Sequence, residues 1–186
     1  MRVWRGMRLV VRRLYMKRLV TLLLGVWALS AAVPASDALV QARDLQADAE
    51  MARAGGMPIV VFFASDFCPY CHEVEELYLE PLQRHGAYAE RVLIRKVHVD
   101  RAIPLVDFAG RRMGHDDFAR REGASLTPLI RFYAPDGREL AAALRGMSSR
   151  EFYGGMLWEA LDESIRKLCL TSVAGEAAAG RGRRCG

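Results

Sequence analysis

Apolar and polar positions along the chain follow two different periods, and the changes between them predict an alternation of helices and strands. In residues 38–54 the apolar side chains recur near the spacing of an amphipathic helix, which is expected to end at Gly55 and Gly56. Residues 57–64 (MPIVVFFA) form an uninterrupted apolar, β-branched and aromatic run of strand length. Such a run is typical of a central strand that is covered on both faces.

A second helix is predicted to begin at Cys68 and to reach about Leu79, after which Pro81 either kinks it or opens another short helix. The elements predicted after it are strands at 92–99, 127–133 and 139–144, turns at 110 and 135–137, and a short helix at 115–122. Residues 148–151 (SSRE) resemble a capping box, which opens a final amphipathic helix to about Leu168.

Strands that alternate with helices, closed by a hairpin and a last helix, predict an α/β sandwich whose mixed sheet is covered on both faces. Hydrophobic residues make up 52% of the 186 residues, which is ample for the core of one domain. The expected division is a leader at 1–35, an N-terminal helical segment at 36–56, the α/β domain at 57–170 and a disordered tail at 171–186. That tail is rich in Gly, Ala and Arg.

The net charge of +5 comes from the first residues of the chain. Seven basic side chains precede residue 19, whereas the first acidic one is Asp37. Without those seven, 20 basic side chains stand against 22 acidic ones. The rest of the chain therefore carries no basic footprint, and we expect no nucleic-acid partner.

The same basic segment has the three parts of a secretory signal peptide. It is followed by the apolar run 19–29 and by the small residues 30–35, with cleavage expected after Ala35 or Ala38. Met16 would make a more ordinary start for such a signal. The apolar run is shorter than the roughly 20 residues of a membrane span, and an uncleaved anchor is the alternative. In either case the folded part is expected in the periplasm, where disulfide chemistry is permitted.

Cys68 and Cys71 are the candidate catalytic residues. Two cysteines three positions apart at the start of a helix face the same side, so their sulfurs can form a reversible bond. The first cysteine meets the positive end of the helix dipole and unpaired N–H groups, and both favour its thiolate. Because the thiolate is the attacking form, we assign Cys68 as the nucleophile and Cys71 as the thiol that resolves the mixed disulfide.

The residues around the two cysteines are expected to tune this chemistry. Pro69 and Tyr70 set the geometry of the loop and belong to the expected substrate-binding surface. His72 adds a partial positive charge beside the site and is a candidate modulator of the thiol pKa. Three glutamates at 73–76 act in the opposite direction.

Two other chemistries use the same residue types. A zinc site needs two further ligands at sensible spacing, and His85 and His98 provide no such pattern, so we expect no metal. The run 68–72 (CPYCH) also satisfies the C-x-x-C-H signature of haem attachment, with a methionine as a second axial ligand. A buried strand ahead of the motif is unlike a small helical haem protein, so the haem protein is the less favoured alternative.

These features resemble the thioredoxin superfamily over roughly residues 57–168. The matching pieces are VVFFASDFCPYC, LTPLIRFYAPDGREL and the last helix. The stretch LVDFAGRRMGHDDFARREGASLTP is similar to the insert of exported thioredoxin-like proteins encoded with sulfur-oxidation (Sox) operons, and to the catalytic domain of disulfide isomerases of the DsbC type. The resemblance implies a thioredoxin fold and a thiol:disulfide oxidoreductase that needs no bound cofactor.

The resemblance also implies a role for Thr127 and Pro128, which lie before an apolar strand, with Pro128 57 residues after Cys71. In this superfamily the proline is cis and lies beside the cysteines, so that the backbone before it is free to pair with a bound substrate strand. Thr127 and Pro128 are therefore predicted to contact the substrate.

From the related exported proteins we expect reduction of protein disulfides, with protein clients and a membrane reductant of the DsbD type as partners. The enzyme alternatives are a disulfide oxidase or isomerase of the Dsb type. DsbC-type isomerases use an N-terminal dimerisation domain that this chain lacks, so a monomer is expected.

Two positions depart from the thioredoxin pattern. Thioredoxins carry a buried acid six positions before the first cysteine, which accepts the proton of the resolving thiol, and that position is Phe62 here. The residue before the motif is Phe67 rather than the usual Trp. Proton handling must then come from water, from His72 or from another group.

Cys169 and Cys185 lie outside the motif and are separated by the polar tail. In an oxidising compartment they could form a second disulfide. The alternative is a thiol at the end of the last helix and an exposed thiol that is prone to mixed disulfides.

Overall fold

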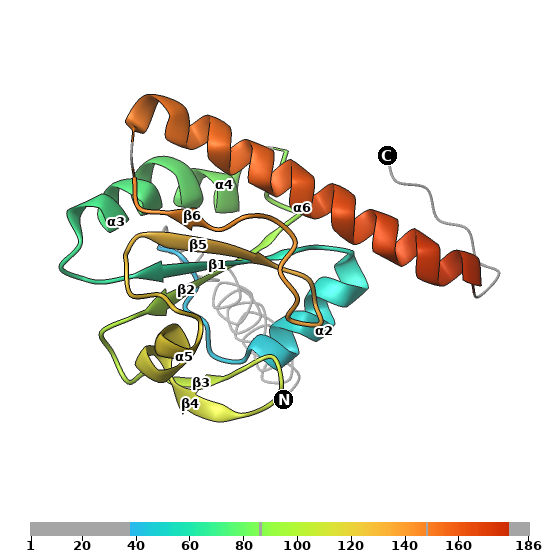
Figure 1. The fold of residues 1–186 in the computed structure, drawn as a ribbon, viewed down its shortest axis with the longest axis horizontal. Coiled ribbons are helices and arrows are strands. Elements are labelled where there is room, and N and C mark those ends of the chain that lie inside the picture. The colour runs from blue at the N-terminus through green and yellow to red at the C-terminus, as the bar shows by residue number, and fades with distance from the viewer. Residues whose placement is uncertain (1–37, 86, 148, 179–186) are drawn as a thin grey trace, which may run out of the picture. The chain divides into compact units, whose positions relative to one another are not determined.

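The computed structural model describes residues 38–85, 87–147 and 149–178 (Figure 1). The helices are α2 (Leu45–Gly55), α3 (Pro69–Val74), the π-helix η1 (Glu75–Leu79), α4 (Glu80–Arg84), α5 (His115–Arg121) and α6 (Arg150–Ala178). The strands are β1 (Ile59–Ala64), β2 (Leu93–His98), β3 (Pro104–Val106), β4 (Arg112–Gly114), β5 (Leu129–Tyr133) and β6 (Leu144–Arg145).

The main sheet has four strands in the order β2-β1-β5-β6. Strand β1 pairs in parallel with β2 and antiparallel with β5, and β5 pairs antiparallel with β6. The register places Phe62 opposite Lys96 of β2 and Phe63 opposite Leu129 of β5. The predicted α/β class with a mixed sheet is confirmed, and the fold is the thioredoxin fold.

Strand β1 is central and all six of its side chains are buried. Successive side chains of a strand point to opposite faces of the sheet. Val60, Phe62 and Ala64 accordingly join one apolar cluster, together with residues of α3, η1, α4 and α6. Ile59, Val61 and Phe63 join the other cluster, with residues of α2 and α5. Figure 1 shows these two sets of helices on opposite faces of the sheet, as the apolar run predicted.

The first predicted helix begins later than expected. Residues 38–44 are extended, because Lys96 donates its backbone N–H to Val40 and the Ala42 N–H donates to the Lys96 carbonyl, both at 2.9 Å. These bonds satisfy backbone groups at the outer edge of β2, which an edge strand otherwise leaves unpaired. Helix α2 then begins after Asp44, whose side chain accepts from the Ala47 N–H at 2.8 Å.

The end of the chain also differs from the prediction. The returning strand at 139–144 is reduced to an isolated bridge between Glu139 and Tyr133, followed by the two-residue strand β6. Helix α6 continues to Ala178, so that residues 171–178 are helical rather than part of a disordered tail. This segment is rich in alanine, which has the highest helix propensity.

The hairpin of β3 and β4 was not predicted beyond a turn at Gly110. Asp107 organises this turn, since its buried carboxylate accepts from the N–H groups of Ala109 and Arg111 and from the side chains of Arg111 and Arg121. Burial alone would raise the pKa of Asp107, but these hydrogen bonds outweigh it and lower the pKa. This carboxylate fixes the turn of a hairpin whose Leu105 is buried in the apolar cluster that contains residues of α2 and α5.

The predicted leader at 1–35 lies outside the described residues, and so does Ser148 of the predicted capping box. None of the helices in the described part of the chain combines the length and the apolar character that a membrane span requires.

Two buried tyrosines make a matched test of the core. The Tyr153 hydroxyl has no hydrogen-bond partner among the described residues, whereas the Tyr133 hydroxyl donates to Glu122 at 2.5 Å. A buried polar group without a partner costs free energy, so Tyr153→Phe should leave the free energy of unfolding unchanged or raise it by about 1 kcal/mol. Tyr133→Phe removes a bond to a carboxylate and should lower it by about 1–3 kcal/mol. Urea unfolding followed by circular dichroism measures both, and a loss of stability in Tyr153→Phe would contradict the prediction.

Candidate redox site

The Cys68–Cys71 pair lies at the first turn of α3, after a three-residue loop that follows β1. The two cysteines are joined by a disulfide, with their Cα atoms 5.2 Å apart. Cys68 is the N-cap of α3, and Pro69 occupies the first turn, where its missing N–H costs no hydrogen bond. The spacing of the motif therefore brings the two sulfurs together as predicted.

The two sulfurs have different surroundings. The Cys68 side chain is half-buried and its Sγ accepts from the Cys71 N–H at 3.2 Å, whereas Cys71 is only 1% exposed. A sulfur at the N-terminus of a helix that accepts a backbone N–H is favoured as a thiolate. This difference supports the assigned roles of Cys68 as the attacking thiol and Cys71 as the deeper one.

Thr127 and Pro128 lie at the same edge of the sheet as the motif. The bond between them is cis, as the resemblance implied. Pro128 comes directly before β5, and the first residue of β5, Leu129, pairs with Phe63 near the end of β1. Because the motif follows that end of β1, the proline and the cysteines are brought to one edge by neighbouring strands.

Apolar side chains are exposed around the motif. Phe67 is 90% exposed, Tyr70 54% and Leu126 57%. Phe67 precedes Cys68, Tyr70 lies between the cysteines, and Leu126 precedes Thr127. The sequence analysis predicted Tyr70 as part of this surface but missed Phe67 and Leu126. The position of Phe67, an aromatic residue directly before the motif, was a signal that could have identified it.

His72 lies beside the motif and contacts the loop before it. Its ring Nε2 donates to the backbone carbonyl of Asp66 at 3.1 Å, so the histidine holds the loop that precedes the motif. The side chain is exposed to solvent. An effect of His72 on the thiol remains a prediction.

The loop between β1 and the motif is anchored by a network of polar groups. Asp100 Oδ2 accepts from the Ser65 hydroxyl at 2.8 Å and from the Asp66 N–H at 3.3 Å. The Asp66 carboxylate in turn accepts from His98 Nδ1 at 3.0 Å and pairs with Arg101. Sequence analysis did not find this network, because its members come from the end of β2 and from the loops after both parallel strands.

Two stacked histidines lie at the inner end of this network. His115 is fully buried, its Nδ1 accepts from the His98 backbone N–H at 3.1 Å, and its Nε2 donates to the Ala42 carbonyl at 2.7 Å. Burial, chiefly, lowers the pKa of both rings, and the Lys96 charge adds to the lowering at His98. Both histidines are therefore neutral in the folded protein near neutral pH.

A buried ion pair lies on the face of the sheet that also holds Cys71. The Lys96 ammonium of β2 contacts Glu75 Oε2 of η1 at 2.5 Å. Lys96 is one of two adjacent basic side chains in β2, and a largely buried lysine is a signal in the sequence that a partner exists. Helix α4 begins at Glu80 with Pro81 in its first turn, and it continues from α3 and η1 without a break in the helical backbone.

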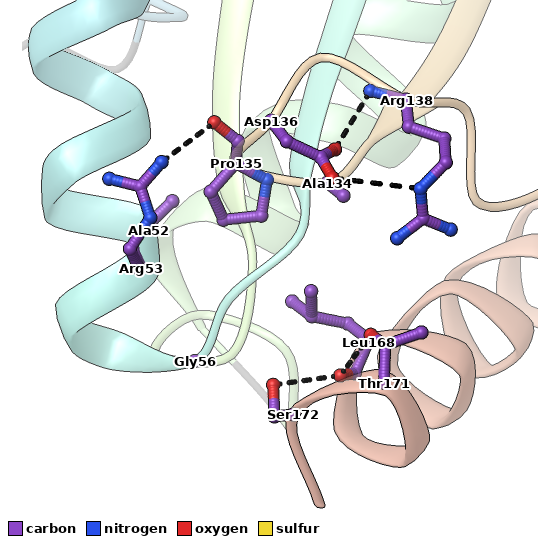
Figure 2. Close-up of a pocket in the computed structure, with 10 residues that line it drawn as sticks. All are labelled: Ala52, Arg53, Gly56, Ala134, Pro135, Asp136, Arg138, Leu168, Thr171 and Ser172. Atoms are coloured by element: carbon purple, nitrogen blue, oxygen red, sulfur yellow. Dashed lines mark hydrogen bonds and ion pairs between the residues drawn. The ribbon is translucent and has the colours of Figure 1, made fainter. Parts of the chain in front are cut away.

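A separate cavity of about 240 Å³ lies at the other end of β5, among the end of α2, the turn after β5 and the far part of α6 (Figure 2). Arg53 closes one side by donating to the Pro135 carbonyl at 3.2 Å. The lining contains no cysteine. This cavity is therefore distinct from the redox site.

Among the described residues, no three His, Cys, Asp or Glu side chains are grouped as a metal ion would require. The haem interpretation of the CPYCH run needs both sulfurs for bonds to the macrocycle, whereas here the two sulfurs bond to each other. The motif also lies in an α/β fold rather than in a helical wrap. The geometry favours dithiol chemistry.

A family model described as the thioredoxin-like domain matches residues 45–158. The chain belongs to this family. No curated protein matches the sequence. The general resemblance to thioredoxins is confirmed, whereas the finer resemblance to Sox-operon and DsbC-type proteins stays a prediction.

Solved structures similar to this chain include three thioredoxins. Thioredoxin O2 from Arabidopsis thaliana in its oxidised state is 18% identical, with a TM-score of 0.44, and the match covers 67% of this chain and 96% of that one. Thioredoxin from Fasciola hepatica is 22% identical, with a TM-score of 0.45 and coverages of 66% and 98%. The periplasmic thioredoxin SoxS from Paracoccus pantotrophus is 14% identical, with a TM-score of 0.40 and coverages of 57% and 98%.

The neutral buried histidines predict how stability depends on pH. Because the pKa values of His98 and His115 are lowered in the folded protein, the unfolded chain binds more protons below the ordinary histidine pKa of about 6.5. The free energy of unfolding should therefore fall as pH is lowered from about 7.5 to about 5.5, by at most about 1.4 kcal/mol per pH unit for each ring. Urea unfolding at several pH values measures the slope.

His115→Asn should lower the overall stability but flatten that slope. The exposed His85 provides the matched control, and His85→Asn should keep the wild-type slope. A slope that is the same in all three proteins would show that the buried rings do not carry the pH dependence.

Proposed function

We propose that this protein is a thiol:disulfide oxidoreductase that reduces disulfides of protein clients in the periplasm. The observation that carries the proposal is the geometry of the Cys68–Cys71 pair. One sulfur is half-exposed at a helix N-terminus and the other is buried one turn deeper. This arrangement separates an attacking sulfur from a resolving one.

The reaction consists of two exchanges. The Cys68 thiolate attacks one sulfur of the client disulfide, a Cys68–client bond forms, and the first client sulfur leaves as a thiolate. Cys71 then loses its proton and attacks the Cys68 sulfur, which releases the second client thiolate and forms the Cys68–Cys71 disulfide. Two electrons pass from the protein dithiol to the client, and the released thiolates take up protons.

The client is an extended polypeptide segment that lies across the exposed edge of the site. Among the described residues, neither the N–H nor the carbonyl of Thr127 takes part in a hydrogen bond, whereas the Pro128 carbonyl accepts from Gly146 at 2.7 Å. The free groups of Thr127 can pair with a client backbone in the manner of an added strand. Phe67, Tyr70 and Leu126 offer apolar contacts to its side chains.

The cellular setting is proposed from the sequence. The basic and apolar segment ahead of residue 36 directs the chain out of the cytoplasm, and a membrane reductant of the DsbD type returns the oxidised pair to the dithiol state. The protein acts as a monomer. If the pair has a strongly oxidising potential, the same chemistry runs as a disulfide oxidase or isomerase, and equilibration with glutathione distinguishes these directions.

Substituting each cysteine by serine separately tests the proposed roles. Cys68→Ser should abolish the reduction of insulin disulfides, because no thiolate remains at the exposed position. Cys71→Ser should accumulate the Cys68–client mixed disulfide, since the resolving thiol is absent. Insulin turbidity and the mass of the peptide that contains residue 68 measure the two outcomes, with Cys169→Ser as the control that retains activity. Activity in Cys68→Ser would refute the function.

The exposed Phe67 tests the client surface. Phe67→Ser should raise KM for a peptide disulfide by roughly 5- to 30-fold, the equivalent of about 1–2 kcal/mol of lost apolar contact, with little change in kcat. Met51 is 55% exposed on α2 and belongs to no part of the redox site, so Met51→Ser is a control with the same kind of substitution. Equal KM values in the two variants would remove Phe67 from the client surface.

A further inference from the structure

The ion pair between Glu75 and Lys96 is buried, and Glu75 lies one helical turn after Cys71. The two side chains are 11% and 14% exposed, and Nζ lies 2.5 Å from Oε2. Replacing such a pair by packed apolar side chains is often neutral or stabilising, because burial removes both charges from water. The pair is therefore weak evidence for stability and calls for another explanation.

Glu75 is placed by the same helix that carries the motif. Its backbone N–H donates to the Cys71 carbonyl, and the two residues are four positions apart. Side chains with this spacing lie on the same helix face, one turn from each other. Glu75 also begins the π-helix η1, a local widening of the helix that is frequent at functional sites.

Strand β1, which lies next to Lys96, supplies no acidic side chain, so a carboxylate near Cys71 has to come from the helix of the motif. In the register of β1 with β2, Lys96 pairs with Phe62, and every side chain of β1 is apolar. Strand β1 thus offers no group that can take a proton from Cys71, which is itself 1% exposed.

The other buried carboxylates of the described residues are engaged elsewhere. Asp48 of α2 binds Arg95 from the opposite face of the sheet, and Asp107 organises the turn of the β3–β4 hairpin. Glu75 is the buried carboxylate on the helix of the motif.

We propose that Glu75 is the proton acceptor of Cys71 in the resolving step, with Lys96 as the residue that positions its carboxylate and balances its charge. This inference rests on the proposed function. The Cys71 thiol proton passes to Glu75, directly or through one water, and the Cys71 sulfur attacks Cys68. The Cys68–Cys71 bond forms, the Cys68–client bond breaks, and the client sulfur leaves with the electron pair of that bond. Glu75 returns the proton to the leaving thiolate or to solvent.

The test measures the resolving step by itself in the full chain. The reduced protein is mixed with excess oxidised glutathione, quenched with acid at short times, and digested. Mass spectrometry of the peptide with residues 68–71 then follows the conversion of the glutathione mixed disulfide into the internal disulfide. The variants are Glu75→Gln with Lys96→Met, which leaves no unpaired buried charge, and Glu76→Gln as the control, an exposed glutamate one position away.

In the wild type an internal base makes deprotonation nearly independent of pH, so the resolving rate should change less than about threefold between pH 6 and pH 8. A positioned general base typically contributes 10²–10⁴-fold. The double variant should therefore resolve at least about 100-fold more slowly at pH 6, with a rate that rises close to tenfold per pH unit as the free thiolate accumulates. Glu76→Gln should keep the wild-type profile.

Two results would overturn the proposal. One is a folded double variant, judged by circular dichroism, with the wild-type rate and pH profile. The other needs no variant: a wild-type resolving rate that rises tenfold per pH unit from pH 6 to pH 8 would show that solvent takes the proton. Either result would leave the Cys68-dependent reduction of insulin intact, whereas loss of the proposed function would appear as wild-type protein that never forms the mixed disulfide.

Discussion

The complete burial of β1 is the constraint on which the rest of the structure depends. A strand whose side chains are buried on both faces needs a helical layer on each side, and both apolar clusters of the protein are built on its alternate residues. The strand ends where the chain leaves the core, and the motif follows there after a short loop. The helix N-terminus, the half-exposed sulfur and the neighbouring cis-proline loop therefore meet at one edge because β1 fixes the positions of its two neighbours.

Most of the carboxylates around the redox site are paired with basic side chains. Their effect on the Cys68 thiolate is therefore smaller than the sequence alone suggests. Two of the three glutamates after the motif are paired, Glu73 with Arg150 and Glu75 with Lys96. The Asp66 carboxylate before the motif is likewise paired with Arg101, and it accepts a hydrogen bond from the neutral His98 ring. The nearby carboxylates therefore oppose a thiolate at Cys68 less than their number suggests, and the helix N-terminus and the Cys71 N–H are the groups directed at its sulfur.

Much of this arrangement could be predicted from sequence, because it depends on strong local patterns. The apolar run of β1, the glycines at the end of α2 and the position of the motif each carry a clear signal, and the order of the main elements follows from them. The features that were missed depend on pairing between distant segments. Residues 38–44 have a helical pattern, yet the unpaired edge of β2 captures them as an extended segment. The turn of the β3–β4 hairpin is organised by one buried carboxylate, Asp107. The role proposed for Glu75 depends on its ion pair with Lys96, which comes from a strand distant in the sequence.

The direction of electron flow follows from small differences between the two redox forms of this site. The disulfide form carries no charge at the sulfurs, whereas the reduced form gains whatever stabilisation the site gives the Cys68 thiolate. Each 1.4 kcal/mol of such stabilisation shifts the potential by about 30 mV towards oxidation of clients. Among the described residues, one backbone donor reaches the Cys68 sulfur, the Cys71 N–H, and it is a modest source of this stabilisation. Pairing of the carboxylates favours the thiolate, whereas the small number of donors to its sulfur limits that stabilisation, and the second effect supports the proposed reduction of clients.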